Sequence, residues 1–167
     1  MDRIKLSDNF YLDEFTRSQT AVRHGIDMSV IEGGLVYTHL RRLCKTILQP
    51  VRDELGPVHI SSGYRPSKLN KLIGGSSNSA HCNGKAADIT VSGYTPLQVA
   101  QWIDENLPNY DQVIHEFGQW VHVSISGPLR EPRGSGLTAV KVPRRFGNPK
   151  TVYIPYILSI EDALKRA

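Results

Sequence analysis

The stretch HCNGKAADI, residues 81–89, carries a histidine and an aspartate seven positions apart, separated by a glycine and small residues. Its second half continues into AADITVS (86–92), which is typical of a β-strand. Gly84 would let the chain turn sharply between the two polar side chains. One interpretation is a surface loop that runs into a strand. The other is that His81 and Asp88 hold a metal ion.

The segments before this stretch predict helices. Residues 9–28 are expected to form a short helix and a loop. From Ser29 to Leu55 apolar residues recur at helical spacing, and Pro50 is expected to kink or end that helix near Gln49. Residues 67–85 are rich in Ser, Asn and Gly, which predicts an irregular loop with one helical turn.

The segments on either side of residues 81–89 also predict strands. Thr95 followed by Pro96 indicates a helix start, and this helix is expected to run to about Asn106. The predicted strands besides 86–92 are VHISS (58–62), DQVIHEF (111–117), WVHVSIS (120–126) and TVYIPYI (151–157). Helices come first and strands mostly later, which predicts an α+β fold with a small, mostly antiparallel sheet and helices packed on one side.

The length of 167 residues fits one compact domain, 1–167, and no linker divides it. Residues 9–126 carry the motifs, and 127–167 are expected to be a C-terminal extension that contains a strand. The formal net charge of +4 suits an anionic polymer such as a bacterial cell wall as readily as nucleic acid. Only the basic residues near the C-terminus support binding to nucleic acid, so we expect no nucleic-acid partner.

Two cysteines, Cys44 and Cys82, do not make a disulfide framework. The first fifteen residues lack the apolar run of a secretory signal, and no stretch approaches the roughly 20 apolar residues that span a bilayer. We therefore expect synthesis in the cytoplasm without a signal peptide, and no transmembrane segment.

The six histidines differ in whether an acidic residue or another histidine lies at a useful spacing from them. His24, His39 and His59 have no acidic or histidine partner at useful spacing, so a structural role is expected for each. His81 and His122 stand on or beside predicted strands, as does the aspartate of the opening stretch. Two His and one carboxylate match the ligand set of a catalytic zinc ion, which keeps a fourth position for water.

Four motifs together resemble the zinc D-Ala-D-Ala peptidase family (peptidase M15), which has the hedgehog/D-Ala-D-Ala peptidase fold, and more narrowly its small phage-type, endolysin-like members. They are SSGYRP (61–66), LNKLIGGSSNSAH (69–81), HCNGKAADI and WVHVS (120–124). The family pattern S-x-H-x6-D, followed later by W-x-H, is present in full. The resemblance covers most of residues 9–126.

The resemblance implies a role for each matching residue. His81, Asp88 and His122 would be the ligands of Zn²⁺. Arg65 would be catalytic and substrate-binding, because its guanidinium would pair with a substrate carboxylate or polarise the scissile carbonyl. Ser79 would hydrogen-bond the peptide backbone of the substrate.

The sequence departs from the family at the general base. In the dipeptidase members an acidic residue lies three positions before the second histidine, where this chain has Gln119, and an amide cannot take a proton from water. Glu116 and His115 are the candidates, and Glu116 fits the pattern of the phage-type members. A two-residue turn at Gly118 and Gln119 would place His115 opposite His122, whereas a longer turn would favour Glu116.

These expectations describe a zinc metallopeptidase that hydrolyses peptidoglycan stem peptides, of D-Ala-D-Ala carboxypeptidase or L-Ala-D-Glu endopeptidase type. Among the settings for such an enzyme, we favour a monomeric phage lysin that acts on the host cell wall. The alternative is a catalytically inactive, metal-stapled module that binds the cell wall or belongs to the virion, with Gln119 as the sign of lost catalysis.

Overall fold

The structure is a computed structural model that describes residues 3–167. The helical elements are α1 (Leu12–Phe15), α2 (Gln19–Arg23), α3 (Leu35–Leu43), the π turn η1 (Cys44–Leu48), α4 (Gln49–Leu55), α5 (Ser67–Leu72), the 3-10 turn η2 (Ala80–Asn83), α6 (Pro96–Asn106) and α7 (Ile160–Arg166). The strands are β1 (Val58–Ser62), β2 (Ala86–Val91), β3 (Gln112–Glu116), β4 (Trp120–Ser124), β5 (Ser135–Val142) and β6 (Lys150–Pro155).

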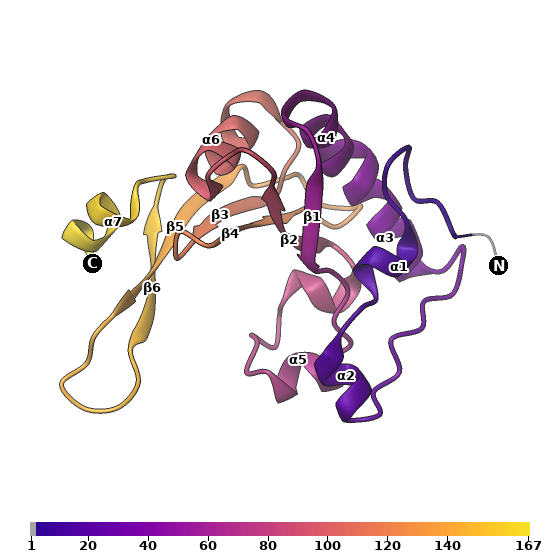
Figure 1. Ribbon diagram of the computed structural model, residues 1–167, viewed down its shortest axis with the longest axis horizontal. Helices are drawn as coiled ribbons and strands as arrows, with labels where there is room; N and C mark the ends of the chain where they lie inside the picture. Colours follow the sequence, from indigo (N-terminus) through magenta and orange to yellow (C-terminus); the bar gives the residue numbers. More distant parts are fainter. Residues whose placement is uncertain (1–2) are drawn as a thin grey trace.

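The strands form one mixed sheet in the order β1-β2-β4-β3-β5-β6. All neighbouring pairs are antiparallel except β3 and β5, which are parallel. In Figure 1, α4 and α6 lie along one side of the sheet, and α2 and α5 lie beyond its other side. The predicted α+β fold with a mostly antiparallel sheet is confirmed. The parallel pair arises because β4 ends at the edge of the sheet where β3 begins, and β5 starts at that same edge on the other side of β3.

Pro50, expected to kink or end the helix near Gln49, does not end it, although the helix type changes there. A proline lacks an N–H group, and its ring clashes with the carbonyl four residues earlier. Here η1 lies before the proline, so the hydrogen-bond spacing widens locally and the helix continues into α4. The helix ends at Gly56, whose φ of 104° is one that side chains rarely adopt. Its start, at Gly34, is also later than predicted.

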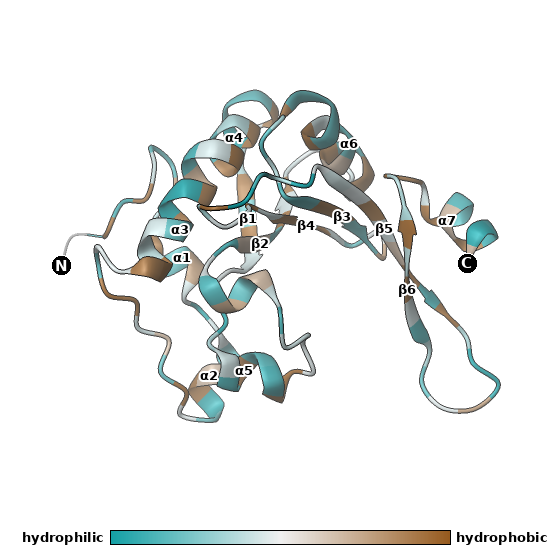
Figure 2. Cartoon of the chain, turned by 180° about the vertical axis from the view of Figure 1, so that it is seen from behind, coloured by the Kyte–Doolittle hydropathy of each residue, from teal (hydrophilic) through white to brown (hydrophobic). Residues whose placement is uncertain are grey.

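The core lies between the sheet and this helical layer. Leu40 and Ile47 of the helices are fully buried, as are Ile89, Val113 and Val121 of the strands. Burial of such a side chain contributes about 1.5–3 kcal/mol. Figure 2 shows the same division, with hydrophilic colouring on the outward turns of α4 and α6. Because side chains alternate along a strand, the neighbours of these core residues point to the opposite face.

Helix α6 begins as predicted. The Thr95 hydroxyl accepts a hydrogen bond from the Gln98 N–H, and the Gln98 side chain reaches back to the Thr95 N–H, forming a capping box. The predicted loop 67–85 contains two helical segments rather than one, since η2 follows α5. Both cysteines are free thiols. In residues 3–167 no helix has the length and apolar character that crossing a membrane requires.

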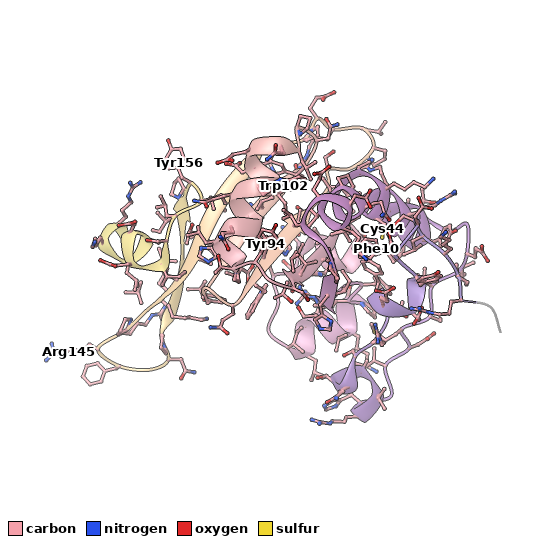
Figure 3. The ribbon with its side chains drawn as sticks, turned by 45° about the horizontal axis from the view of Figure 1, so that its top comes forward. Phe10, Cys44, Tyr94, Trp102, Arg145 and Tyr156 are labelled. Carbon is pink, nitrogen blue, oxygen red and sulfur yellow. The ribbon has the colours of Figure 1, made fainter. Side chains whose placement is uncertain are left out.

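Residues 127–167 continue the sheet through β5 and β6 and end in α7. The sequence prediction missed β5 and α7. Three buried side chains from these elements form a small separate core, namely Val140, Ile154 and Ala163. The loop between β5 and β6 extends from the body of the molecule, and Figure 3 shows Arg145 at its tip.

Candidate metal centre

Three predicted ligands converge on the face of the sheet opposite the core. Asp88 of β2 pairs directly with His122 of β4, so their side chains lie side by side. His81 comes from η2, which packs against β2. One ligand atom from each residue lies within 4.8 Å of the others.

His81 is oriented by the main chain. Its Nδ1 lies 2.7 Å from the carbonyl oxygen of Gly63, and because a carbonyl only accepts, Nδ1 carries the proton. Nε2 then faces the cluster, 3.1 Å from Asp88 Oδ1 and 3.2 Å from His122 Nδ1. His122 Nδ1 lies 3.0 Å from the same carboxylate oxygen. Two ring nitrogens and one carboxylate oxygen therefore meet at one point, an arrangement that a cation would satisfy.

The protonation states also fit a cation. Burial lowers the pKa of His81, so its imidazole is neutral at pH 7. Burial alone would raise the pKa of Asp88, but hydrogen bonds with His122 and His81 outweigh it and hold that pKa well below its ordinary value. A neutral imidazole and an ionised carboxylate are the forms that bind metal ions. These donors, two nitrogens and one oxygen, fit zinc.

Two glycines fix the backbone around the cluster. A Cβ on Gly63 would lie 2.6 Å from the Cα of Phe15, so the close approach of these segments admits no side chain. Gly84, which follows η2, has a φ of 68°, and a Cβ there would lie 2.8 Å from Val36 Cγ1. The turn between the first histidine and β2 therefore requires glycine, as the sequence suggested.

Arg65 lies beside the cluster. Its Nη2 is 3.7 Å from Asp88 Oδ2, and its side chain is 19% exposed. The Arg65 N–H donates to the carbonyl of His81 at 3.1 Å, which ties the two segments together. Within the part of the chain that the structure describes, the buried Nε of Arg65 has no hydrogen-bond partner. The guanidinium therefore keeps a donor free at the site.

The β3–β4 hairpin decides which base candidate faces the cluster. Glu116 pairs with Trp120 and His115 with Val121, so the turn has three residues, 117–119. The two-residue turn considered above is therefore wrong. Phe117 and Gly118 both take positive φ values, 56° and 69°, which allow the longer turn.

In consequence Glu116 and His122 share one face, and Glu116 lines the same cleft as the cluster. His115 points to the opposite face and is 3% exposed. Its Nδ1 donates to the carbonyl of Leu158 at 2.9 Å, which joins β3 to the segment before α7. The structure thus brings Glu116 to the cluster and keeps His115 away from it.

The environment of Glu116 suits a base. Burial raises the pKa of its carboxyl, and the nearby charge of Asp88 raises it further. His122 and Arg65 act in the opposite direction but less strongly than burial. A carboxyl whose pKa moves toward neutrality transfers protons more effectively near pH 7.

The cluster stands in an open cleft of about 680 Å³, which is within the usual range for small-ligand sites. Ser79 and Arg65 line it, as the resemblance implied. The sequence reasoning missed Gln112, Arg133 and Tyr153, which also line it. Strand alternation from Glu116 would have found Gln112, but no local pattern marks the other two.

Two comparisons with known proteins bear on this site. The sequence model of a family described as Peptidase M15 matches residues 8–124, which is most of the chain and includes all three members of the cluster. No curated protein matches the chain.

Proposed function

The chain belongs to the peptidase M15 family, and from this premise we propose that it is a zinc-dependent peptidase that hydrolyses the stem peptides of peptidoglycan. One observation carries the metal part of the proposal. Two imidazole nitrogens, from His81 and His122, and a carboxylate oxygen of Asp88 lie within 3.2 Å of one another. Zinc bound there would lower the pKa of water and polarise a carbonyl.

In the proposed mechanism Glu116 takes a proton from water at the cleft and later gives it to the leaving amine. Its partly buried carboxyl, with a raised pKa, suits both transfers. Arg65 would donate hydrogen bonds to the oxygen of the attacked carbonyl, where negative charge develops, or would hold a substrate carboxylate. Ser79 would bind the peptide backbone.

The substrate class rests on the motif resemblance and is consistent with the net charge of +4, because the cell wall is an anionic polymer. The bond cut is either D-Ala-D-Ala or L-Ala-D-Glu. We propose a monomeric lysin, of phage type, that acts on the host cell wall.

Digestion of purified sacculi, followed by mass spectrometry of the fragments, tests this function. We expect cleavage that stops on addition of a chelator and returns with zinc. Muropeptides shortened by one D-Ala would identify a carboxypeptidase, and free stem peptides an endopeptidase. Cleavage that a chelator leaves unchanged would sink the zinc proposal.

The same assay distinguishes an active peptidase from a catalytically inactive module. Gln119 lies exposed in the β3–β4 turn and Glu116 lines the cleft, so the amide does not stand where the base is proposed. We therefore expect Glu116→Gln to abolish cleavage that the wild-type protein performs. No cleavage by the zinc-loaded wild-type protein would favour the inactive module.

A further inference from the structure

The cleft does not end beside the metal cluster. A second hollow of about 460 Å³ shares three lining residues with it, Asn78, Ala80 and Arg133. The two hollows are therefore neighbouring parts of one groove. In the lining of this part, cationic side chains outnumber acidic ones.

The cations are Lys85, Arg130 and Arg133, with Asp111 as the single acidic residue among the lining side chains. Lys85 immediately precedes β2, and the two arginines belong to the loop between β4 and β5. Three cations against one carboxylate leave the hollow with an excess of positive charge. An anionic group of a ligand would be attracted to it.

Arg133 is held in place by Asp111, which is 4% exposed. Its Nη2 donates to Asp111 Oδ2 at 2.7 Å, its Nε lies 3.1 Å from the same oxygen, and its backbone N–H donates to Oδ1 at 3.1 Å. Arg130 Nη2 reaches Asp111 Oδ1 at 3.1 Å. In residues 3–167 the side-chain hydrogen bonds of Arg133 use Nε and Nη2, so Nη1 stays available to a ligand.

The distance from the metal cluster suits a peptide. Gln112 and Ser124 pair with each other and line the cleft between His122 and Arg133. Ser124 lies two residues along β4 from His122, which is about 7 Å at the usual strand rise. An extended peptide advances about 3.5 Å per residue, so two peptide residues would span the distance from His122 to Ser124, and the next residues would lie in the part of the cleft that Arg133 lines.

We propose that Arg133, with Lys85 and Arg130 beside it, forms a second subsite that binds a free carboxylate of the substrate away from the scissile bond. This inference rests on the proposed function and narrows its substrate class to acidic stem peptides. A guanidinium fork fixed by a buried carboxylate presents its remaining donors in a defined direction, which suits a planar carboxylate. Arg130 and Arg133 lie outside residues 8–124, and Lys85 lies within them, so this subsite belongs mainly to the C-terminal extension.

The test compares two stem peptides that differ in one group, with the glutamate α-carboxylate either free or converted to the amide. We expect the wild-type enzyme to cleave the acid with a kcat/KM about tenfold higher, the lower end for a charge-assisted hydrogen bond. Arg133→Gln should lower kcat/KM for the acid about tenfold and leave the amide unchanged. Arg145→Gln removes an equal charge at the tip of the β5–β6 loop (Figure 3) and should change neither.

Equal losses on both peptides, or the same selective loss in Arg145→Gln, would overturn the subsite. If circular dichroism shows that Arg133→Gln does not fold, Lys85→Gln replaces it. We then expect a smaller loss of kcat/KM, on the acid alone. An equal loss of kcat/KM on both peptides would count against the proposal. If the wild type cleaves neither peptide, the proposed function falls. Calorimetric titration then decides the subsite alone: tighter binding of the acid that Arg133→Gln removes supports it, and equal or absent binding overturns it.

Discussion

The two walls of the cleft differ in how firmly their side chains are held. The wall within residues 8–124 carries His81, which is 1% exposed and whose Nδ1 donates to the carbonyl of Gly63. The wall from the C-terminal extension carries Arg133 and Tyr153, which are about half exposed. A buried, mutually bonded constellation suits chemistry, whereas exposed side chains on a secure backbone suit recognition. On the functions proposed above, the family-matched part would supply the reaction and the extension its selectivity.

The largest expected effect comes from the first wall. His81→Ala removes one of three proposed ligands, so zinc content should fall to near zero and hydrolysis to background. Tyr153→Ala, in the second wall, should keep zinc at the wild-type level and raise only KM. His59→Gln is the matched control, since His59 is exposed and outside the cleft. Metal analysis and peptide hydrolysis on the same samples measure both, and zinc retained by His81→Ala would contradict the assignment.

The next effect separates the two base candidates, which are neighbours on opposite faces of β3. Glu116→Gln should lower kcat by about 10²–10⁴ with zinc retained, because it removes a proton acceptor. His115→Leu should leave kcat within a few-fold and reduce the free energy of unfolding by about 1–2 kcal/mol, because the Leu158 carbonyl loses its donor. Steady-state kinetics and urea unfolding measure these quantities. The reverse pattern would make His115 the base.

A smaller effect is expected from the support beneath the ligands. Gly63→Ala forces its Cβ against the backbone of Phe15, which would shift the carbonyl that orients His81. Loss of such support typically lowers metal affinity about 10–100-fold. Gly127→Ala is the control, because Gly127, like Gly63, has no positive φ, and its added Cβ would meet only Lys85 Nζ, at an ordinary 3.5 Å. Zinc competition titrations should separate the two, and equal zinc affinities would show that the Gly63 carbonyl is dispensable.

The two walls also differ in what the sequence could predict. His81, Asp88 and Ser79 lie within ten residues, and their spacing is set by one turn and one strand, so a short motif predicts their convergence. Arg133 reaches the cleft only because β5 pairs in parallel with β3, a long-range contact that no local pattern encodes.

The general base was partly predictable from the sequence. The choice between Glu116 and His115 depended on whether the hairpin turn has two or three residues, and one residue of register exchanges the faces of a strand. Phe117 at positive φ is uncommon for an aromatic residue, so the local sequence left the length of the turn open. Pro50 is a similar case, since the preceding π turn depends on how the helix packs and not on its sequence alone.

The smallest expected effect concerns the anchor of the second wall. Burial would raise the pKa of Asp111, but hydrogen bonds from Arg133 outweigh it and lower that pKa below its ordinary 3.8. The stabilisation of the folded state by ionised Asp111 is therefore complete above pH 3.8. It is lost as the pH falls through the lower pKa that Asp111 has in the folded state. Asp111→Asn should cost about 1–2 kcal/mol at pH 7, because charge-assisted bonds become neutral ones while both arginines remain half solvated.

That cost should be equal at pH 7 and pH 5 and shrink below pH 3.8, where the Asp111 carboxylate begins to protonate in the unfolded state but not yet in the folded one. Urea unfolding of both proteins across this range measures it, and hydrogen exchange locates it. Faster exchange confined to residues 126–134, with zinc content unchanged, would show that the recognition wall loosens independently of the catalytic wall. A cost that stays constant down to pH 2 would contradict the charge-assisted origin of the stabilisation. Zinc loss in Asp111→Asn would mean that the two walls form one cooperative unit.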